Sequence, residues 1–281
     1  MSICFFEGAF RPTKECALPV TDLAITRGVG VFDTLRSFGG KPFALEEHMK
    51  RLEESALRAG IAIGDVVDNI RQAIADGLKR SDCPNGGNCA VKSYITGGDT
   101  NDLGMFPNPR YFIVIDSANP PLDEEYRAGI ALLPTAETRP YPTIKSINYL
   151  IGIMQCAGRP DVRECLYCPG GEITETLASS FFAHIGGTLF TAPLGTVLGG
   201  VTRGFVIDLA RAYGFKVVEL APKLADLADA DEAFITGTLK DVLPVVRVGD
   251  TVIGSGKPGP VSARLLRLLR EYRERRLTSQ P

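Results

Sequence analysis

The sequence predicts a mixed α/β fold, because alternating stretches typical of strands and amphipathic stretches typical of helices occur together without a strict βαβ order. The chain has 281 residues, of which 44% are apolar and 23% are charged, as in ordinary globular proteins. That length is enough for two modest domains. A polar segment with two prolines follows Ser117 and has no periodicity, so we interpret 118–128 as a linker between domains at 1–117 and 129–281.

The first domain is expected to contain a hairpin, since residues 32–38 alternate as in a strand and Gly39 and Gly40 then supply a tight turn. Apolar residues from Leu45 recur at helical spacing until Gly60 interrupts the pattern. A second helix is expected at 66–78, and strands at 90–96 and 111–116. In the second domain we expect strands at 130–134, 164–167, 180–185 and 232–235, and helices near 146–158, 202–213 and 260–276.

The charges nearly cancel: 31 Lys and Arg against 33 Asp and Glu give a net charge of −2. This balance offers no field that would attract a polyanion, so nucleic acid is not expected as a partner. No stretch reaches the ~18 apolar residues of a membrane span, and the N-terminus lacks the basic and apolar regions of a signal peptide. We therefore expect a cytoplasmic protein without a membrane partner.

Seven cysteines are scattered along the chain, and we expect them to be reduced thiols. Cys165 and Cys168 form a C-x-x-C pair, but no second pair accompanies it and the chain has only two histidines. A zinc site needs four such ligands, so no metal site is expected.

A glycine-containing segment precedes one predicted helix: Leu198-Gly-Gly-Val-Thr-Arg203 leads directly into the pattern at 202–213. Glycines there allow close backbone approach, and the N–H groups of a first helical turn bind phosphate well. The segment is neither a G-x-G-x-x-G motif nor a Walker loop, so a nucleotide is not indicated.

Three further segments carry groups suited to chemistry. Lys145 lies where a stretch with prolines meets an apolar helical pattern. Glu175 precedes a strand amid small and apolar residues, and a buried carboxylate there needs a cationic partner or a proton. Thr238 ends an apolar strand and could add a hydroxyl to an anion site.

In this order and spacing the segments resemble the class IV aminotransferases, the pyridoxal-phosphate enzymes of fold type IV. The resemblance covers nearly the whole chain, through residues 6–10, 28–36, 47–52, 145–149, 175–182, 198–203 and 232–245. It implies a small N-terminal and a larger C-terminal domain, pyridoxal 5′-phosphate as the cofactor, and an amino acid and a 2-oxo acid as substrates. It also implies a homodimer with a shared active site, to which the neighbouring subunit contributes residues near Arg27.

The family's roles transfer to matching positions. Lys145 would be the catalytic lysine, which holds the cofactor as a Schiff base and moves the Cα proton. Glu175 would face the pyridine nitrogen and keep it protonated, and Leu198 would pack against the ring. The phosphate would be held by Arg51, the N–H groups of Val201 and Thr202, and the hydroxyl of Thr238. A non-catalytic pyridoxal-phosphate carrier would have no need for Lys145 and Glu175 together.

Two cofactor positions depart from the family pattern. Ser180 stands where asparagine is usual, so a hydrogen bond near the cofactor is altered, although serine can still donate. Tyr149 matches neither common version of its segment, because branched-chain enzymes have a tyrosine one residue later. We place both residues among the cofactor contacts.

The substrate is indicated by Arg27, which stands where branched-chain enzymes tend to have a tyrosine and which suits a carboxylate. Lys92 and Lys240 could add positive charge if they point inward. The segment 96–104 lacks the Arg-x-His pair of the best-known D-amino-acid enzymes. We favour a D-amino-acid transaminase that uses 2-oxoglutarate or pyruvate as acceptor; a branched-chain L-amino-acid aminotransferase and an aminodeoxychorismate lyase are the alternatives.

Overall fold

A computed structural model describes residues 2–99 and 105–279, which fall into two compact units. The first unit takes the chain up to Asn119, Ile144–Asn148, and the chain from Arg276 onward; the second takes Pro120–Thr143 and Tyr149–Arg275. The expected domain limits place residues 144–148 with the second domain, whereas the contacts of this segment place it in the first unit.

The first unit is built on a six-stranded sheet in the order β2-β1-β6-β5-β3-β4, in which all neighbours pair antiparallel. Its strands are β1 (Ile3–Phe6), β2 (Ala9–Pro12), β3 (Gly30–Phe38), β4 (Lys41–Pro42), β5 (Cys89–Thr96) and β6 (Arg110–Ser117). Its helical segments are η1 (Thr13–Glu15), α1 (Leu23–Arg27), α2 (Leu45–Arg58), α3 (Val66–Leu78) and η2 (Pro84–Gly87).

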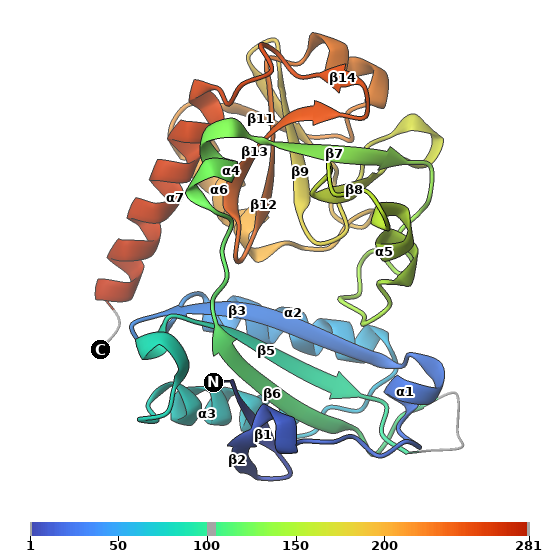
Figure 1. The fold of residues 1–281 in the computed structure, drawn as a ribbon, viewed down its shortest axis with the longest axis vertical. Helices are drawn as coiled ribbons and strands as arrows, with labels where there is room; N and C mark the ends of the chain where they lie inside the picture. The colour runs from blue at the N-terminus through green and yellow to red at the C-terminus, as the bar shows by residue number, and fades with distance from the viewer. Residues whose placement is uncertain (1, 100–104, 280–281) are drawn as a thin grey trace. The chain divides into compact units, whose positions relative to one another are not determined.

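Helices α2 and α3 lie against one face of this sheet (Figure 1). Apolar residues at helical spacing, including Met49 and Leu52 of α2, join the core formed with Val31 and Leu35 of β3. Residues 31, 33, 35 and 37 of β3 are all buried. Because side chains alternate along a strand, Phe32 points to the opposite face.

That opposite face carries three stacked aromatic rings, which we call the aromatic row (Phe32, Tyr94 and Phe112). The ring centres of Phe32 and Tyr94 are 5.5 Å apart, and those of Tyr94 and Phe112 are 4.7 Å apart. The three residues are direct cross-strand neighbours on β3, β5 and β6. Three strands therefore present one continuous aromatic surface.

The second unit is built on an eight-stranded sheet in the order β11-β10-β9-β12-β13-β7-β8, with β14 paired to β13. Its strands are β7 (Ile130–Thr135), β8 (Glu164–Tyr167), β9 (Ser180–Ile185), β10 (Thr188–Thr191), β11 (Lys216–Glu219), β12 (Glu232–Gly237), β13 (Asp241–Val248) and β14 (Thr251–Val252). Its helical segments are α4 (Asp123–Ala128), α5 (Leu150–Cys156), η3 (Pro169–Gly171), α6 (Val201–Ala212), η4 (Leu224–Asp229) and α7 (Pro260–Thr278), the last residues of which belong to the first unit.

The sheet of the second unit is buried on both faces. Phe182 and Phe234 stack at 5.0 Å and join a core cluster with apolar residues of α6 and α7. Their chain neighbours Phe181 and Ile235 belong to a separate cluster. Successive residues of a strand point to opposite faces, so β9 and β12 contribute to both cores.

Two of the expected elements differ in the structure. The helix expected at 146–158 begins only at Leu150, because Ser146 instead forms a bridge to Val31 of β3. The expected linker at 118–128 contains α4, at whose start the Glu125 carboxylate accepts a hydrogen bond from the Leu122 N–H at 2.9 Å.

Within residues 2–99 and 105–279, no helix combines the length and the apolar character needed to cross a membrane. All seven cysteines carry free thiols. Cys165 and Cys168 are buried, and burial raises the pKa of each thiol to about 12.

Candidate active site

Lys145 lies in the short segment Ile144–Asn148, which runs beside β3 in the first unit. The Phe32 N–H donates a hydrogen bond to the Lys145 carbonyl at 2.9 Å, and the Ile147 N–H donates to the Gly30 carbonyl at 3.1 Å. The backbone of the lysine is therefore held as an extension of the sheet.

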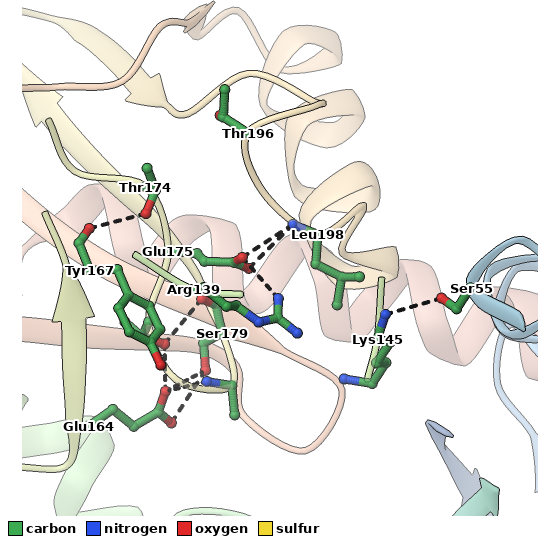
Figure 2. Close-up of polar contacts among 12 residues, drawn as sticks. Ser55, Arg139, Lys145, Glu164, Tyr167, Thr174, Glu175, Ser179, Thr196 and Leu198 are labelled. Atoms are coloured by element: carbon green, nitrogen blue, oxygen red, sulfur yellow. Dashed lines mark hydrogen bonds and ion pairs between the residues drawn. The ribbon is translucent and has the colours of Figure 1, made fainter. Parts of the chain in front are cut away.

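Two side chains of the first unit contact Lys145. Its backbone N–H donates to the Oγ of Ser55 on α2 at 3.2 Å (Figure 2). Its Nζ lies 4.6 Å from the ring centre of Phe32. An ammonium group over an aromatic face is attracted by the ring electrons. The amine of Lys145 thus lies at the aromatic row.

Arg51 lies on α2 and is held by Asp33 of β3. Its Nε donates to Asp33 Oδ2 at 2.7 Å and its Nη2 donates to Oδ1 at 2.9 Å. Asp33 is 1% exposed and also contacts His48 Nδ1 at 2.7 Å. Burial alone would raise the pKa of Asp33, but Arg51 and His48 hold that pKa well below its ordinary value. The carboxylate is therefore ionised and fixes the guanidinium.

Glu175 is the central buried carboxylate of the second unit, with 3% exposure. Arg139 Nη1 donates to its Oε1 at 2.9 Å, and the Leu198 N–H donates to the same carboxylate at 3.3 and 3.4 Å (Figure 2). Burial opposes the charge of Arg139, but the Glu175 carboxylate raises the pKa of the guanidinium. The sequence indicated that a buried Glu175 needs a cationic partner, yet did not identify Arg139.

The N-terminus of α6 lies beside the first residue of β9. Gly200 is the N-cap, and Val201 and Thr202 begin the helix, where N–H groups have no acceptor within the helix itself. A Cβ at Gly200 would lie 2.8 Å from Ser180 Oγ, so only glycine permits this close approach. Ser180 therefore lies at the helix terminus where an anion would bind.

Two threonines near the end of β12 add hydroxyl groups. Thr236 pairs with Ser180 in the sheet, and within the part of the chain that the structure describes its buried Oγ1 has no hydrogen-bond partner. Thr238 follows the strand and is half-buried. A buried hydroxyl without a partner is costly unless a ligand or water satisfies it. Thr236 was not among the residues predicted from the sequence, although it stands two residues before Thr238 in Phe-Ile-Thr-Gly-Thr.

Lys240 forms an ion pair with Glu164, which is 5% exposed, and donates to Ser179 Oγ at 2.9 Å. Glu164 also accepts a hydrogen bond from the Ala178 N–H at 3.1 Å. The ammonium of Lys240, which the sequence suggested for the substrate, is thus paired with an internal carboxylate. This pair holds the turn between Glu175 and β9.

Two of the other candidate residues, Arg27 and Lys92, are exposed on the first unit, whereas Tyr149 interacts electrostatically with Arg139, the partner of Glu175. Arg27 ends α1 and is exposed, with its Nη1 donating to the Thr26 carbonyl at 2.8 Å. Lys92 is exposed on β5, two residues before Tyr94, and therefore on the face of the aromatic row. Tyr149 is the N-cap of α5. Of the segment 96–104, which lacks the Arg-x-His pair, residues 100–104 lie outside the described residues.

The structure therefore brings the candidate residues together in two groups. In the first unit, β3 and α2 position both Lys145 and Arg51. In the second unit, Glu175 and the N-terminus of α6 are joined through the Leu198 N–H. The other candidate residues in the second unit are Tyr149, Ser180, Thr238 and Lys240.

Each of these groups suits a different part of pyridoxal phosphate. A buried, ionised carboxylate such as Glu175 suits a protonated pyridine nitrogen. The N–H groups of α6 and the unpartnered hydroxyl of Thr236 suit a phosphate, and the amine of Lys145 suits an aldehyde carbon.

Comparison with known proteins agrees with this chemistry. Residues 30–248 match the family described as amino-transferase class IV. The chain is 28% identical over 264 residues to a D-alanine aminotransferase of Bacillus licheniformis, with 92% of each chain covered. It is 30% identical over 281 residues to a putative branched-chain-amino-acid aminotransferase of Methanocaldococcus jannaschii, with 96% of each covered.

A solved structure supports the same relationship. The branched-chain amino acid aminotransferase of T.th., solved with pyridoxamine 5′-phosphate, superposes with a TM-score of 0.85 at 26% identity, covering 96% of this chain and 93% of that one. The chain belongs to the class IV aminotransferase family, and it is a transaminase of fold type IV whose cofactor is pyridoxal 5′-phosphate.

Proposed function

We propose that Lys145, Glu175 and the N-terminus of α6 carry transamination between an α-amino acid and a 2-oxo acid, with D-amino acids as the preferred donors. The observation that carries the proposal is the buried carboxylate of Glu175. Its contact with the Leu198 N–H ties it to the segment that begins α6. If Glu175 only formed a structural salt bridge, Arg139 alone would be a sufficient partner and the contact with the Leu198 N–H would not be needed.

Pyridoxal phosphate supplies an aldehyde that accepts the amino group and a ring that withdraws electrons from the substrate Cα. Glu175 would keep the ring nitrogen protonated, since its own charge is stabilised by fixed donors. Lys145 would hold the cofactor through its amine and, once the substrate is bound, would act as the general base and acid that moves the proton of the substrate Cα.

The preference for D-amino acids rests on two cations of the first unit. Arg27 and Lys92 are exposed, and within residues 2–99 and 105–279 neither forms an ion pair with a carboxylate. Lys92 shares a sheet face with Phe32, over which the Lys145 amine lies. These cations would bind the carboxylates of the amino acid and of its 2-oxo acid partner, 2-oxoglutarate or pyruvate. The D-alanine aminotransferase of Bacillus licheniformis is a relative with this preference in its name.

Branched-chain L-amino acids are the second candidate. The aromatic row gives the surface at the Lys145 amine an apolar character that suits an aliphatic side chain. The relative from Methanocaldococcus jannaschii and the superposed structure are named for these substrates.

The test is the absorption spectrum of the purified protein during separate additions of D-alanine, D-glutamate, L-leucine and L-glutamate. Loss of the aldehyde-form band with the D-acids alone supports the proposal, and loss with L-leucine supports the branched-chain alternative. No change with any of the four would favour the lyase. The Lys145→Ala variant should lack both the visible band and turnover, and normal turnover by this variant would contradict the role of Lys145.

We also propose that the enzyme is a homodimer. The short helix α5 exposes three apolar side chains at helical spacing, Leu150 at 69%, Ile153 at 55% and Met154 at 65%. Exposed apolar patches of this kind mark protein interfaces. Sedimentation of the wild type and of Ile153→Glu tests the proposal: a wild-type monomer with full activity would contradict it.

A further inference from the structure

Asp33 is a buried carboxylate of the first unit whose position is fixed by its neighbours. It lies on β3 with 1% exposure, and three hydrogen bonds reach its carboxylate. Two come from Arg51, at 2.7 Å to Oδ2 and 2.9 Å to Oδ1, and the third comes from His48 Nδ1, at 2.7 Å to Oδ1. A parallel pair of N–H···O bonds fixes the plane of a guanidinium as well as its position.

The contact with Asp33 determines the proton position on His48. Burial lowers the pKa of His48 below its ordinary value of 6.5, although the Asp33 carboxylate opposes this shift. The ring is therefore neutral near pH 7, and the nitrogen that faces an ionised carboxylate must be the one that carries the proton. His48 thus donates from Nδ1 and holds Asp33 Oδ1 on the side next to Arg51, whose Nη2 lies 3.3 Å from that nitrogen.

The same strand also holds the segment of the catalytic lysine. Phe32, the neighbour of Asp33 in the chain, donates its N–H to the Lys145 carbonyl and lies beneath the Lys145 amine. Successive residues of β3 thus fix two groups on opposite faces of the sheet: Phe32 positions Lys145, and Asp33 positions Arg51.

We propose that Asp33 and His48 are positioning residues that orient the Arg51 guanidinium for the phosphate of the cofactor. This inference rests on the proposed assignment of Arg51 to the phosphate. Arginine has a long side chain, and freezing its rotamers upon binding would weaken affinity. Because Asp33 and His48 fix the guanidinium beforehand, that loss does not occur when the phosphate binds.

The charges explain why orientation is the decisive property. The ionised Asp33, the charged Arg51 and the neutral His48 have a net charge of zero, so this cluster does not attract an anion by excess charge. Hydrogen bonds from correctly placed N–H groups remain as its contribution to phosphate binding.

The experiment compares the affinity of the full-length protein for pyridoxal phosphate with its affinity for pyridoxal, which lacks the phosphate. The variants are Asp33→Asn, His48→Leu, His48→Asn and Arg51→Gln. The control is Glu46→Gln, which removes an exposed α2 carboxylate that pairs with Arg71. The ³¹P resonance of the bound cofactor provides a second readout in each holoenzyme.

We expect Asp33→Asn and His48→Leu to weaken pyridoxal phosphate binding about 10-fold or more, the effect of one misplaced charged hydrogen bond, and to shift the ³¹P resonance. Pyridoxal affinity should stay within about twofold by the same reasoning, since the lost bond acts on the phosphate. His48→Asn should restore most of the affinity, because its amide can donate from nearly the same place. Glu46→Gln should behave as the wild type.

The outcomes separate the two assignments. If Arg51→Gln leaves pyridoxal phosphate binding unchanged, Arg51 does not bind the phosphate and the proposed site is wrong at that residue. If Arg51→Gln weakens binding but Asp33→Asn and His48→Leu do not, the positioning role is wrong. Equal losses for pyridoxal and pyridoxal phosphate would also overturn it, because they indicate general damage to the fold. Should Asp33→Asn fail to fold, the two His48 variants decide the question.

Discussion

The backbone N–H of Lys145 donates a hydrogen bond to the Oγ of Ser55, and Ser55 lies one helical turn after Arg51 on α2. One helix therefore anchors both residues that the first unit contributes to the proposed cofactor site. Ser55 is 1% exposed, so its hydroxyl is not available to bulk water. The contact is formed by the backbone of Lys145, so the amine takes no part in this anchor.

We expect Ser55→Ala to lower the free energy of unfolding by about 1–3 kcal/mol, because the Lys145 N–H loses its buried acceptor. The same change should lower kcat more than it changes KM, since the segment that carries the amine loses an anchor. Chemical denaturation and steady-state kinetics measure the two effects. Ser55→Thr keeps the hydroxyl and serves as the matched variant; a wild-type kcat for Ser55→Ala would show that the anchor does not matter for catalysis.

Replacement of Glu175 should separate catalysis from cofactor retention. Glu175→Gln should keep part of the bound cofactor and lose most of the activity, because a neutral amide cannot hold the ring nitrogen protonated. It should also destabilise the protein, since Arg139 then lies buried without its counter-charge. The double variant Glu175→Gln with Arg139→Met should regain stability without regaining activity. Near-normal transamination by Glu175→Gln would contradict the role of this residue.

A double-mutant cycle tests whether Lys240 serves the fold or the substrate. Lys240→Met should lower the free energy of unfolding by about 3–5 kcal/mol, because it leaves the buried Glu164 charge without its partner, and Glu164→Gln should lower it by less, because Lys240 is partly exposed. The double variant should lose less than the sum of the two, as expected for residues in direct contact. A Lys240→Met protein of normal stability with a raised KM would instead assign Lys240 to the substrate.

Arg27→Ala and Lys92→Ala should act on substrate binding. If either cation holds a carboxylate, its loss should raise KM about 10- to 150-fold, the range of one charged hydrogen bond. Lys14→Ala, which removes an exposed lysine of η1, is the control. An unchanged KM for both variants would place these two cations outside the substrate pocket.

Acid should destabilise the protein in a range set by His48. Its folded pKa is lowered by burial, so the unfolded chain binds more protons below pH 6.5. The contribution of His48 to stability is therefore complete above pH 6.5 and is lost as the pH falls through the folded value. Urea denaturation from pH 7.5 to pH 4.5 should show this decline in the wild type and a smaller one in His48→Asn. Parallel curves for the two proteins would contradict the prediction.

Local patterns predicted the elements that have one exposed face. Alternation over 32–38 identified β3, and apolar spacing identified α2, because in each case one face is buried and the other is not. Strand β13 was not predicted, because it contains Pro244 and a proline argues against a strand. The strands expected at 164–167, 180–185 and 232–235 are buried almost as continuously, but none of them contains a proline.

Local sequence patterns could not predict contacts between residues that are far apart in the chain. Arg139 and Glu175 are 36 residues apart, and the sequence around either residue does not indicate the other as its partner. The residues after Lys145 resemble the start of a helix, but hydrogen bonds with β3 determine their conformation instead. Tertiary contacts of this kind override local preference. The family resemblance, rather than any local pattern, suggested which residues contact the cofactor.

Residues 144–148 belong to the first unit although the residues on either side of them in the sequence belong to the second, and this arrangement limits how a protease can separate the units. The chain passes between the units at four peptide bonds, 119–120, 143–144, 148–149 and 275–276. A protease that nicks the backbone once could therefore not release either unit as an intact fragment. For the same reason, no single segment of the gene encodes one unit alone: a segment that includes all of the first unit also includes the second, and a segment that includes all of the second unit also includes Lys145.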